Sequence, residues 1–389
     1  MESTLRMLLL FLTLFHHLQP HSSASTLPKE ALPTRSGYLL VNSTTGSAIF
    51  YAFYEAQNPS DTSLSETPLV IWLQGGPGCS SMTGNFFELG PWRVTASMKQ
   101  NVEHLSLEPN PGSWNRIFGL LFLDNPIGTG FSIASTPEEI PRDQNAVARH
   151  LFIAIRKFLA LDPSFKSRPI YITGESYAGK YVPSIGYYIL KKNPLLPVSK
   201  RINLYGLAIG NGLTHPETQV NTYASHTYYL GLINEKQKTK MEKLQFEVIK
   251  LIKAGGIVLT IPSDVVGAAL HADVMKSVKY MVEFVVKNTK LLLYQGQCDL
   301  RDGVVSVESW VKKMKWEGIG KFLDAEKDVW RVNGVLAGYV QKWDNLSHVV
   351  VLGAGHFVPT DQNVNSQAMI EDWVLDKGSF AIKNATSDR

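Results

Sequence analysis

The sequence predicts an α/β fold with a mostly parallel, doubly wound central sheet. Two observations support this class. Short apolar runs of strand length alternate along most of the chain with stretches of helical pattern. In addition, a Gly-x-Ser-x-Ala segment at residues 174–178 joins one apolar run directly to one helical stretch. In a sheet of this kind, ligands collect at the carboxyl ends of the strands.

Six short apolar runs are predicted strands. They span residues 68–74, 120–125, 169–173, 204–209, 290–294 and 348–352. The main predicted helices span residues 144–161, 180–193, 306–315 and 365–375. Asp143 is a suitable N-cap for the first of these helices, because its carboxylate can accept a hydrogen bond from the first turn.

One region interrupts the alternation. Residues 233–289 are helical in pattern, Lys-rich in the first half and apolar in the second. We interpret this stretch as a helical cap that is inserted over the sheet. The remainder of residues 25–389 is then a single domain that carries the cap.

The N-terminus has the pattern of a secretory signal peptide over residues 1–24. Arg6 supplies the positive charge, residues 7–15 the apolar region and residues 22–24 the small cleavage-site residues. The apolar run is too short for a membrane span, which needs roughly 20 residues. We therefore expect no membrane span and a protein of the secretory pathway, either secreted or vacuolar or lysosomal.

Composition excludes several classes of function. The net charge is +4 and no block of Lys and Arg stands out, which argues against a nucleic-acid partner. No cluster of potential ligands has the spacing of a metal site, and no nucleotide-binding signature is present. We expect neither a metal nor a cofactor. The oligomeric state stays open, a homodimer included.

Two further features concern covalent chemistry. Asn42, Asn345 and Asn384 stand in glycosylation sequons, which fits a secretory route. Cys79 and Cys298 are the two cysteines. Either they form a disulfide bond or Cys79 is a buried thiol, because sequence alone does not show how far apart they lie.

Ser176 is the candidate nucleophile. A serine between small residues at a sharp strand-to-helix turn is how the α/β-hydrolase fold presents an Oγ atom above its sheet. In that fold an acid and then a histidine follow, each after a later strand. Asp299 and His356 satisfy this order, and Asp302 competes with Asp299, which lies nearer its strand. The resulting Ser-Asp-His triad would carry out acyl transfer through a covalent acyl-enzyme.

Several longer motifs resemble the serine carboxypeptidase family, in order from about residue 36 to residue 373. They span residues 72–81, 87–91, 110–115, 123–132, 174–179, 210–212 and 353–362. Gln-Gly-Gly-Pro-Gly at residues 74–78 is similar to the branch of plant serine carboxypeptidase-like and animal retinoid-inducible and vitellogenic-like carboxypeptidases. The resemblance implies an exopeptidase whose substrates are peptides with a free C-terminus.

The resemblance also implies roles for further residues. Gly76 and Tyr177 would donate backbone N–H groups to the oxyanion. The set that would hold the substrate carboxylate is Gln74, Gly75, Glu88 and Glu175. Glutamates that face a carboxylate must be protonated, and burial and crowding favour this by raising their pKa. We therefore expect an acidic pH optimum.

Three functions remain under consideration. The first is the exopeptidase. The second is an acyltransferase of the same family that uses glucose esters as donors. Glu175 favours the peptidase, because these acyltransferases usually carry Asp before the serine. The third is a catalytically silent secretory protein, since the cap is several dozen residues shorter than in typical members, around residues 254–262.

Overall fold

The computed structural model of the protein describes residues 28–59, 63–99, 102–255 and 265–381. The expected signal peptide, the Asn384 sequon and most of the 254–262 stretch lie outside the described residues. The chain divides into a unit that ends at Leu32 and a unit that begins at Pro33. Of the first unit the structure describes a short 3-10 turn, Lys29–Ala31. All that follows concerns the second unit.

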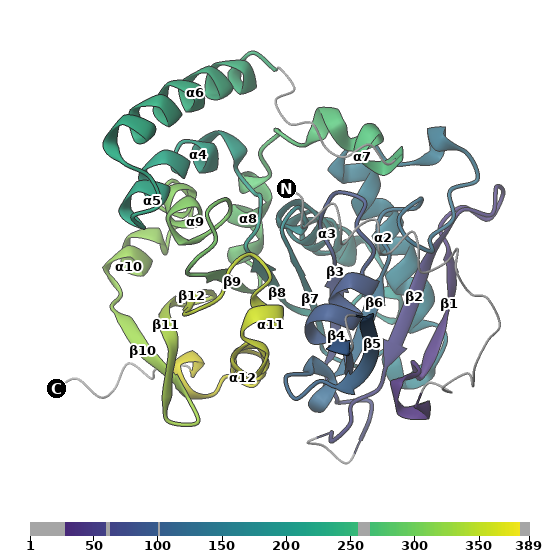
Figure 1. The fold of residues 1–389 in the computed structure, drawn as a ribbon. Coiled ribbons are helices and arrows are strands. Elements are labelled where there is room, and N and C mark those ends of the chain that lie inside the picture. Colours follow the sequence, from purple (N-terminus) through teal and green to yellow (C-terminus); the bar gives the residue numbers. More distant parts are fainter. Residues whose placement is uncertain (1–27, 60–62, 100–101, 256–264, 382–389) are drawn as a thin grey trace. The chain divides into compact units, whose positions relative to one another are not determined.

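A ten-stranded sheet forms the centre of this unit, in the order β1-β2-β6-β3-β7-β8-β9-β12-β11-β10 (Figure 1). Six adjacent strands are parallel and correspond to the six predicted strands. They are β3 (Leu69–Leu73), β6 (Gly119–Leu123), β7 (Ile170–Glu175), β8 (Leu204–Gly210), β9 (Lys290–Gly296) and β12 (Leu346–Val351). The predicted fold class is thus confirmed.

Antiparallel strands extend the sheet at both edges, and the sequence analysis does not predict them. They are β1 (Arg35–Leu40), β2 (Ala48–Tyr54), β10 (Lys327–Val332) and β11 (Val335–Trp343), and a separate hairpin pairs β4 (Trp92–Lys99) with β5 (Val102–Pro109). β1 and β10 are the outermost strands and each buries only one residue, so their apolar signal is weak. β2, by contrast, is an apolar run that the same reasoning could have detected.

Helices cover both faces of the sheet, because alternate residues of each strand point to opposite sides. Leu291 and Leu293 of β9 belong to the core with α2 (Gln144–Leu159), α3 (Ala178–Lys192) and α9 (Val304–Val311). Leu292 and Tyr294 belong to the core with α12 (Asn363–Val374). The four helices match the four predicted ones, and Asp143 caps α2 by accepting a hydrogen bond from Ala146 N–H at 2.9 Å.

In the described residues between β8 and β9, α4 (Pro216–Val220) and α5 (Tyr223–Tyr229) precede the expected cap. The α-helices described within the expected cap are α6 (Glu235–Lys253), α7 (Val265–Leu270) and α8 (Lys279–Val286). α6 packs against α4 and α5, away from the sheet, and exposes most of its polar side chains (Figure 1). α8 instead packs against α3 and buries three valines, which explains the apolar second half of the region.

The order of the strands determines where a site can form. After β3 the chain crosses to β6 on one side, whereas after β7 it continues to β8 on the other side. The chain therefore leaves β3 and β7 toward opposite sides of the sheet, and we expect a ligand to bind at the carboxyl ends of these two neighbouring strands. Gly75 and Gly76 lie in the loop after β3, and Ser176 begins the loop after β7.

Candidate active site

Ser176 occupies a sharp turn between β7 and α3 with a backbone φ of 62°. Its N–H donates to the Gly210 carbonyl oxygen at 3.0 Å, and its carbonyl oxygen accepts from Leu213 N–H at 2.9 Å. A positive φ is unfavourable for a residue with a Cβ atom, and such strain is concentrated at functional sites. The surrounding hydrogen bonds hold this turn at the carboxyl end of the sheet.

His356 and Asp299 face each other from loops that follow the neighbouring strands β12 and β9. The His356 Nδ1 atom lies 2.7 Å from Asp299 Oδ2. Burial opposes ionisation of Asp299, but the hydrogen bond and charge of His356, together with hydrogen bonds from the Arg301 N–H and from Asn211, outweigh it and lower the pKa of Asp299 to about 2. An ionised Asp299 accepts the Nδ1 proton, which leaves Nε2 as the basic nitrogen of His356.

Asp302, the alternative acid, has other partners. It is fully buried, and its two oxygens accept hydrogen bonds from Arg301 Nε at 2.8 Å and from Gln219 Nε2 at 3.0 Å. Among the described residues its side chain makes no hydrogen bond to His356. The geometry therefore favours Asp299 as the partner of the histidine.

Asn211 is a site residue to which the sequence analysis assigns no role. Its Nδ2 donates to Asp299 Oδ2 at 2.6 Å, and its Oδ1 accepts from Gly296 N–H at 3.2 Å. Asn211 also has a positive φ of 42°, a conformation that Asn tolerates better than most residues. An Asn between two glycines directly after a strand is the sequence signal that could have identified it.

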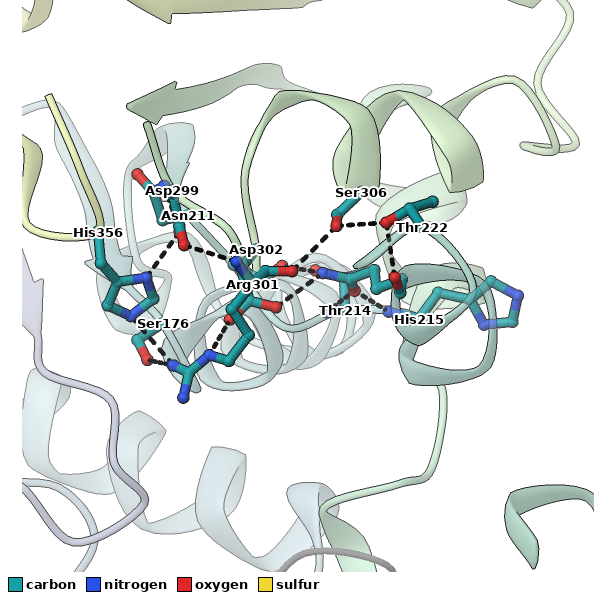
Figure 2. A network of polar contacts seen from close by, with 12 residues as sticks. Ser176, Asn211, Thr214, His215, Thr222, Asp299, Arg301, Asp302, Ser306 and His356 are labelled. Atoms are coloured by element: carbon teal, nitrogen blue, oxygen red, sulfur yellow. Dashed lines mark hydrogen bonds and ion pairs between the residues drawn. The ribbon is translucent and has the colours of Figure 1, made fainter. Parts of the chain in front are cut away.

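Arg301 is a second residue that the sequence analysis misses, and it contacts both reactive side chains (Figure 2). Its Nη2 atom lies 3.0 Å from Ser176 Oγ and 3.1 Å from His356 Nε2. Because a guanidinium group only donates hydrogen bonds, Nε2 must act as the acceptor, which agrees with a proton on Nδ1. The only signal in the sequence is the position of Arg301 two residues after Asp299.

A buried polar cluster lies beside the serine turn. Gln74 Nε2 donates to Glu88 Oε1 at 3.2 Å and to Glu175 Oε1 at 3.0 Å, and Gln74 Oε1 accepts from Trp72 Nε1 at 2.8 Å. Glu88 belongs to the π-helical turn η2 (Gly84–Leu89). Both hydrogens of the Gln74 amide are thus used inside the protein. The amide orients the two carboxyl groups and has no N–H to spare for a ligand.

The two carboxyl groups of this cluster have raised pKa values. Burial raises the pKa of Glu88 to about 7, although its hydrogen bond with Gln74 opposes the shift. Burial, and then the nearby charge of Glu88, raise the pKa of Glu175 well above its usual range. The Oε2 atoms of both residues are buried and make no hydrogen bond to any residue that the structure describes. As protonated groups they can donate to an anion.

The two candidate oxyanion donors lie in the loops that follow β3 and β7. In the described part of the chain, neither the Gly76 N–H nor the Tyr177 N–H donates to a protein acceptor. A Cβ atom on Gly75 would lie only 2.6 Å from the Tyr177 nitrogen, so glycine permits the two loops to approach closely. Gly76 has a φ of 111°, which also favours glycine.

Several other expectations are altered by the structure. Cys79 and Cys298 are both exposed and no disulfide bond joins them, so both expectations, a disulfide bond and a buried Cys79 thiol, are wrong. Asn345 and Asn42 are half-buried. The Asn345 Nδ2 atom, to which a glycan would be attached, donates to the Val286 carbonyl oxygen at 2.9 Å, and the glycosylation of both sites stays a prediction.

Two further features are absent from the described residues. No group of three or more His, Cys, Asp and Glu side chains there could hold a metal ion. Within the same residues, no helix has both the length and the apolar character to cross a membrane.

Comparisons with known proteins show the family to which the chain belongs. The family model for serine carboxypeptidase matches residues 26–255 and 259–376. Serine carboxypeptidase-like 50 from Arabidopsis thaliana is 50% identical over 448 residues, which cover 100% of this chain and 98% of that protein. A probable serine carboxypeptidase CPVL from Homo sapiens is 31% identical over 424 residues, which cover 92% of this chain and 86% of that protein.

A solved structure resembles the fold. Kex1(delta)p, a prohormone-processing carboxypeptidase from Saccharomyces cerevisiae, has a TM-score of 0.78 and 23% identity, over 90% of this chain and 92% of that one. The alignment with the Arabidopsis protein is longer than the 389 residues of this chain, so that relative contains residues that are absent here. The family match is interrupted within the expected cap.

Proposed function

Because the chain belongs to the serine carboxypeptidase family, we propose that it is a serine-type exopeptidase that releases the C-terminal residue of peptides at acidic pH. The observation that carries this proposal is the buried cluster of Gln74, Glu88 and Glu175 beside Ser176. A simple esterase has no need of two buried carboxyl groups at this place. A carboxypeptidase needs a site that recognises the free carboxylate of its substrate.

In the proposed mechanism the substrate carboxylate accepts hydrogen bonds from the protonated Oε2 atoms of Glu88 and Glu175 and from the Gly75 N–H. Ser176 Oγ attacks the adjacent carbonyl carbon and its proton passes to His356 Nε2. The Gly76 and Tyr177 N–H groups stabilise the oxyanion. Nε2 then protonates the leaving amine, and water hydrolyses the resulting ester with His356 as the base.

The raised pKa of Glu88, about 7, supports an acidic working range. Below this value the carboxyl group is neutral and donates a hydrogen bond, whereas above it the group is charged and repels the substrate carboxylate. An acidic compartment of the secretory pathway, the vacuole or the lysosome, fits this dependence. Secretion into an acidic medium fits it equally.

The proposal is tested by release of leucine from N-acylated Phe-Leu between pH 4 and pH 7. Wild-type protein is compared with Ser176→Ala, and the substrate with its C-terminal amide. Release that depends on Ser176, is greatest at acidic pH and is lost with the amide supports the exopeptidase. A folded wild-type protein that releases no leucine contradicts it. The acyltransferase, the second candidate, is then tested by acyl transfer from a glucose ester to an alcohol or amine. If the protein catalyses neither reaction, the catalytically silent secretory protein is the hypothesis that remains.

A further inference from the structure

Arg301 places a permanent positive charge at the reaction centre. Its Nη2 atom lies within hydrogen-bonding distance of both Ser176 Oγ and His356 Nε2. The family mechanism described above has no step that requires this charge. The hydrogen bond even competes with catalysis, because it occupies the Nε2 lone pair that must accept the serine proton.

The guanidinium group is held in place by a buried network (Figure 2). Arg301 Nε donates to Asp302 Oδ2 at 2.8 Å, and Asp302 Oδ1 accepts from Gln219 Nε2 at 3.0 Å. Gln219 Oε1 accepts in turn from the N–H groups of Thr214 and His215, both at 2.8 Å. Asp302, Gln219 and Thr214 are fully buried. The network therefore anchors the Nε atom, which we call the inner edge of the guanidinium group. The outer edge, formed by Nη1 and Nη2, takes no part in this network.

The outer edge of Arg301 is available to a ligand. The side chain is 58% exposed, and its Nη1 atom has no hydrogen-bond partner in the described chain. Nη1 and Nη2 together form the planar fork that binds a carboxylate through two parallel hydrogen bonds. A carboxylate is also a stronger acceptor for this cation than the neutral Ser176 hydroxyl or the neutral His356 ring.

The position of Arg301 indicates which part of a substrate it meets. Gln74 and Glu175 lie at the ends of β3 and β7, whereas Arg301 follows β9, which is two strands beyond β7 in the sheet. We consider a peptide whose C-terminal carboxylate lies at Gln74 and Glu175 and whose scissile carbonyl lies at Ser176. The residue that precedes the scissile bond then extends toward Arg301. That preceding residue is P1, on the acyl side of the scissile bond.

From this arrangement we propose that Arg301 is a specificity-determining residue that selects peptides with Asp or Glu at P1. The inference rests on the proposed exopeptidase function and adds a substrate class to it. A P1 carboxylate binds the Nη1–Nη2 edge and draws Nη2 away from His356 Nε2. The lone pair of Nε2 then becomes available at the moment when the correct substrate is bound, so kcat rises together with affinity.

The local charges are compatible with this assignment. The charged or titratable groups around the guanidinium are Asp302, Asp299, His356 and Tyr223. Asp302 faces the inner edge, and Asp299 is already paired with His356 and Asn211. Neither carboxylate occupies the outer edge.

The test compares N-acyl-Glu-Leu with the isosteric, neutral N-acyl-Gln-Leu at pH 5.5. For the wild type we expect kcat/KM to be greater for the Glu peptide by at least about tenfold. In Arg301→Gln the ratio falls to within about threefold of one, and in Arg301→Lys it lies between, because a point charge replaces the fork. Arg331→Gln, at an exposed position on β10, removes the same charge elsewhere and keeps the wild-type ratio.

Two further measurements make the outcome decisive. The preference disappears as the pH falls below about 4.3, where the P1 glutamate is protonated and resembles glutamine. Reaction of Ser176 with an uncharged fluorophosphonate, together with the melting temperature, shows that each variant is folded. Equal rates on both peptides in the wild type, or a preference that survives in Arg301→Gln, overturn the inference. If N-acyl-Phe-Leu is still cleaved in that case, the proposed exopeptidase function stands and only the role of Arg301 is rejected. If no peptide is cleaved, both proposals are rejected.

Discussion

The side chains of Gln74 and Glu175 are joined by a hydrogen bond of 3.0 Å, although they are 101 residues apart in the chain. Both are almost completely buried, and the same Gln74 nitrogen also binds Glu88. This contact connects the loop after β3 to the end of β7. It holds two carboxyl groups in a buried environment that raises their pKa values.

Glu88→Gln is expected to flatten the pH dependence of KM. The wild-type KM rises as the pH increases through about 7, because Glu88 ionises and repels the substrate carboxylate. A glutamine stays neutral, so the KM of the Glu88→Gln enzyme changes less between pH 6 and pH 8 than that of the wild type. Steady-state kinetics with N-acyl-Phe-Leu measure this. The exposed Glu326→Gln serves as the control and keeps the wild-type profile; an unchanged profile in Glu88→Gln would argue against the role of Glu88.

The same carboxyl group makes the folded protein less stable at higher pH. The pKa of Glu88 is about 7 in the folded state and 4.5 as the reference value, so the folded state binds the proton more tightly. This contribution is fully present below about pH 4.5 and is lost as the pH rises through about 7, at a cost on the order of 3 kcal/mol. Denaturant unfolding at pH 5 and pH 8 measures the loss. In Glu88→Gln the free energy of unfolding should differ less between pH 5 and pH 8 than in the wild type. An equal difference in both proteins contradicts the raised pKa of Glu88.

Asp299→Asn and Asp302→Asn separate the two candidate acids. Asp299 accepts the Nδ1 proton of His356, and an amide in its place favours the wrong tautomer, so kcat falls by about 10⁴-fold with little change in KM. Asp302 contacts Arg301 instead, so its variant should lose far less kcat on a substrate with an apolar P1 residue. Single-turnover kinetics on N-acyl-Phe-Leu distinguish them. A larger loss in the Asp302 variant would reverse the assignment.

Asn211→Ala and Asn211→Gly test whether the hydrogen bond to Asp299 matters apart from the backbone. Both variants remove the 2.6 Å hydrogen bond, but only glycine adopts the positive φ of 42° without strain. We expect kcat to fall about tenfold in both variants. Recovery of wild-type kcat in Asn211→Gly would show that the backbone conformation, and not the amide, is what the site requires.

Gly84→Ala is expected to damage the Gln74 cluster by overpacking. A Cβ atom at this position would lie 2.2 Å from Trp72 Nε1, and Trp72 is fully buried. We expect a loss of roughly 1–3 kcal/mol in the free energy of unfolding and a raised KM. Gly320→Ala is the matched control, because α10 (Ile319–Asp324) leaves open space around that position. A Gly84→Ala protein as stable as wild type would contradict the close contact with Trp72.

Much of the fold could be predicted from local patterns. The parallel strands are buried on both faces and therefore appear as continuous apolar runs, which is why 169–173 and 290–294 were identifiable. The Asp143 cap of α2 depends on neighbours within one turn. β1 and β10 are not predicted, because each of these edge strands buries only one residue and lacks this signal.

The sequence by itself determined the family, the order of the strands along the chain and the three candidate residues Ser176, Asp299 and His356. These follow from spacing and from residue types that the strand-to-loop turns require. Only the tertiary structure decided that Asp299 and not Asp302 contacts His356, and that Arg301 lies against Ser176. Both contacts depend on the direction in which side chains leave a loop and on partners more than fifty residues away, which local periodicity does not encode.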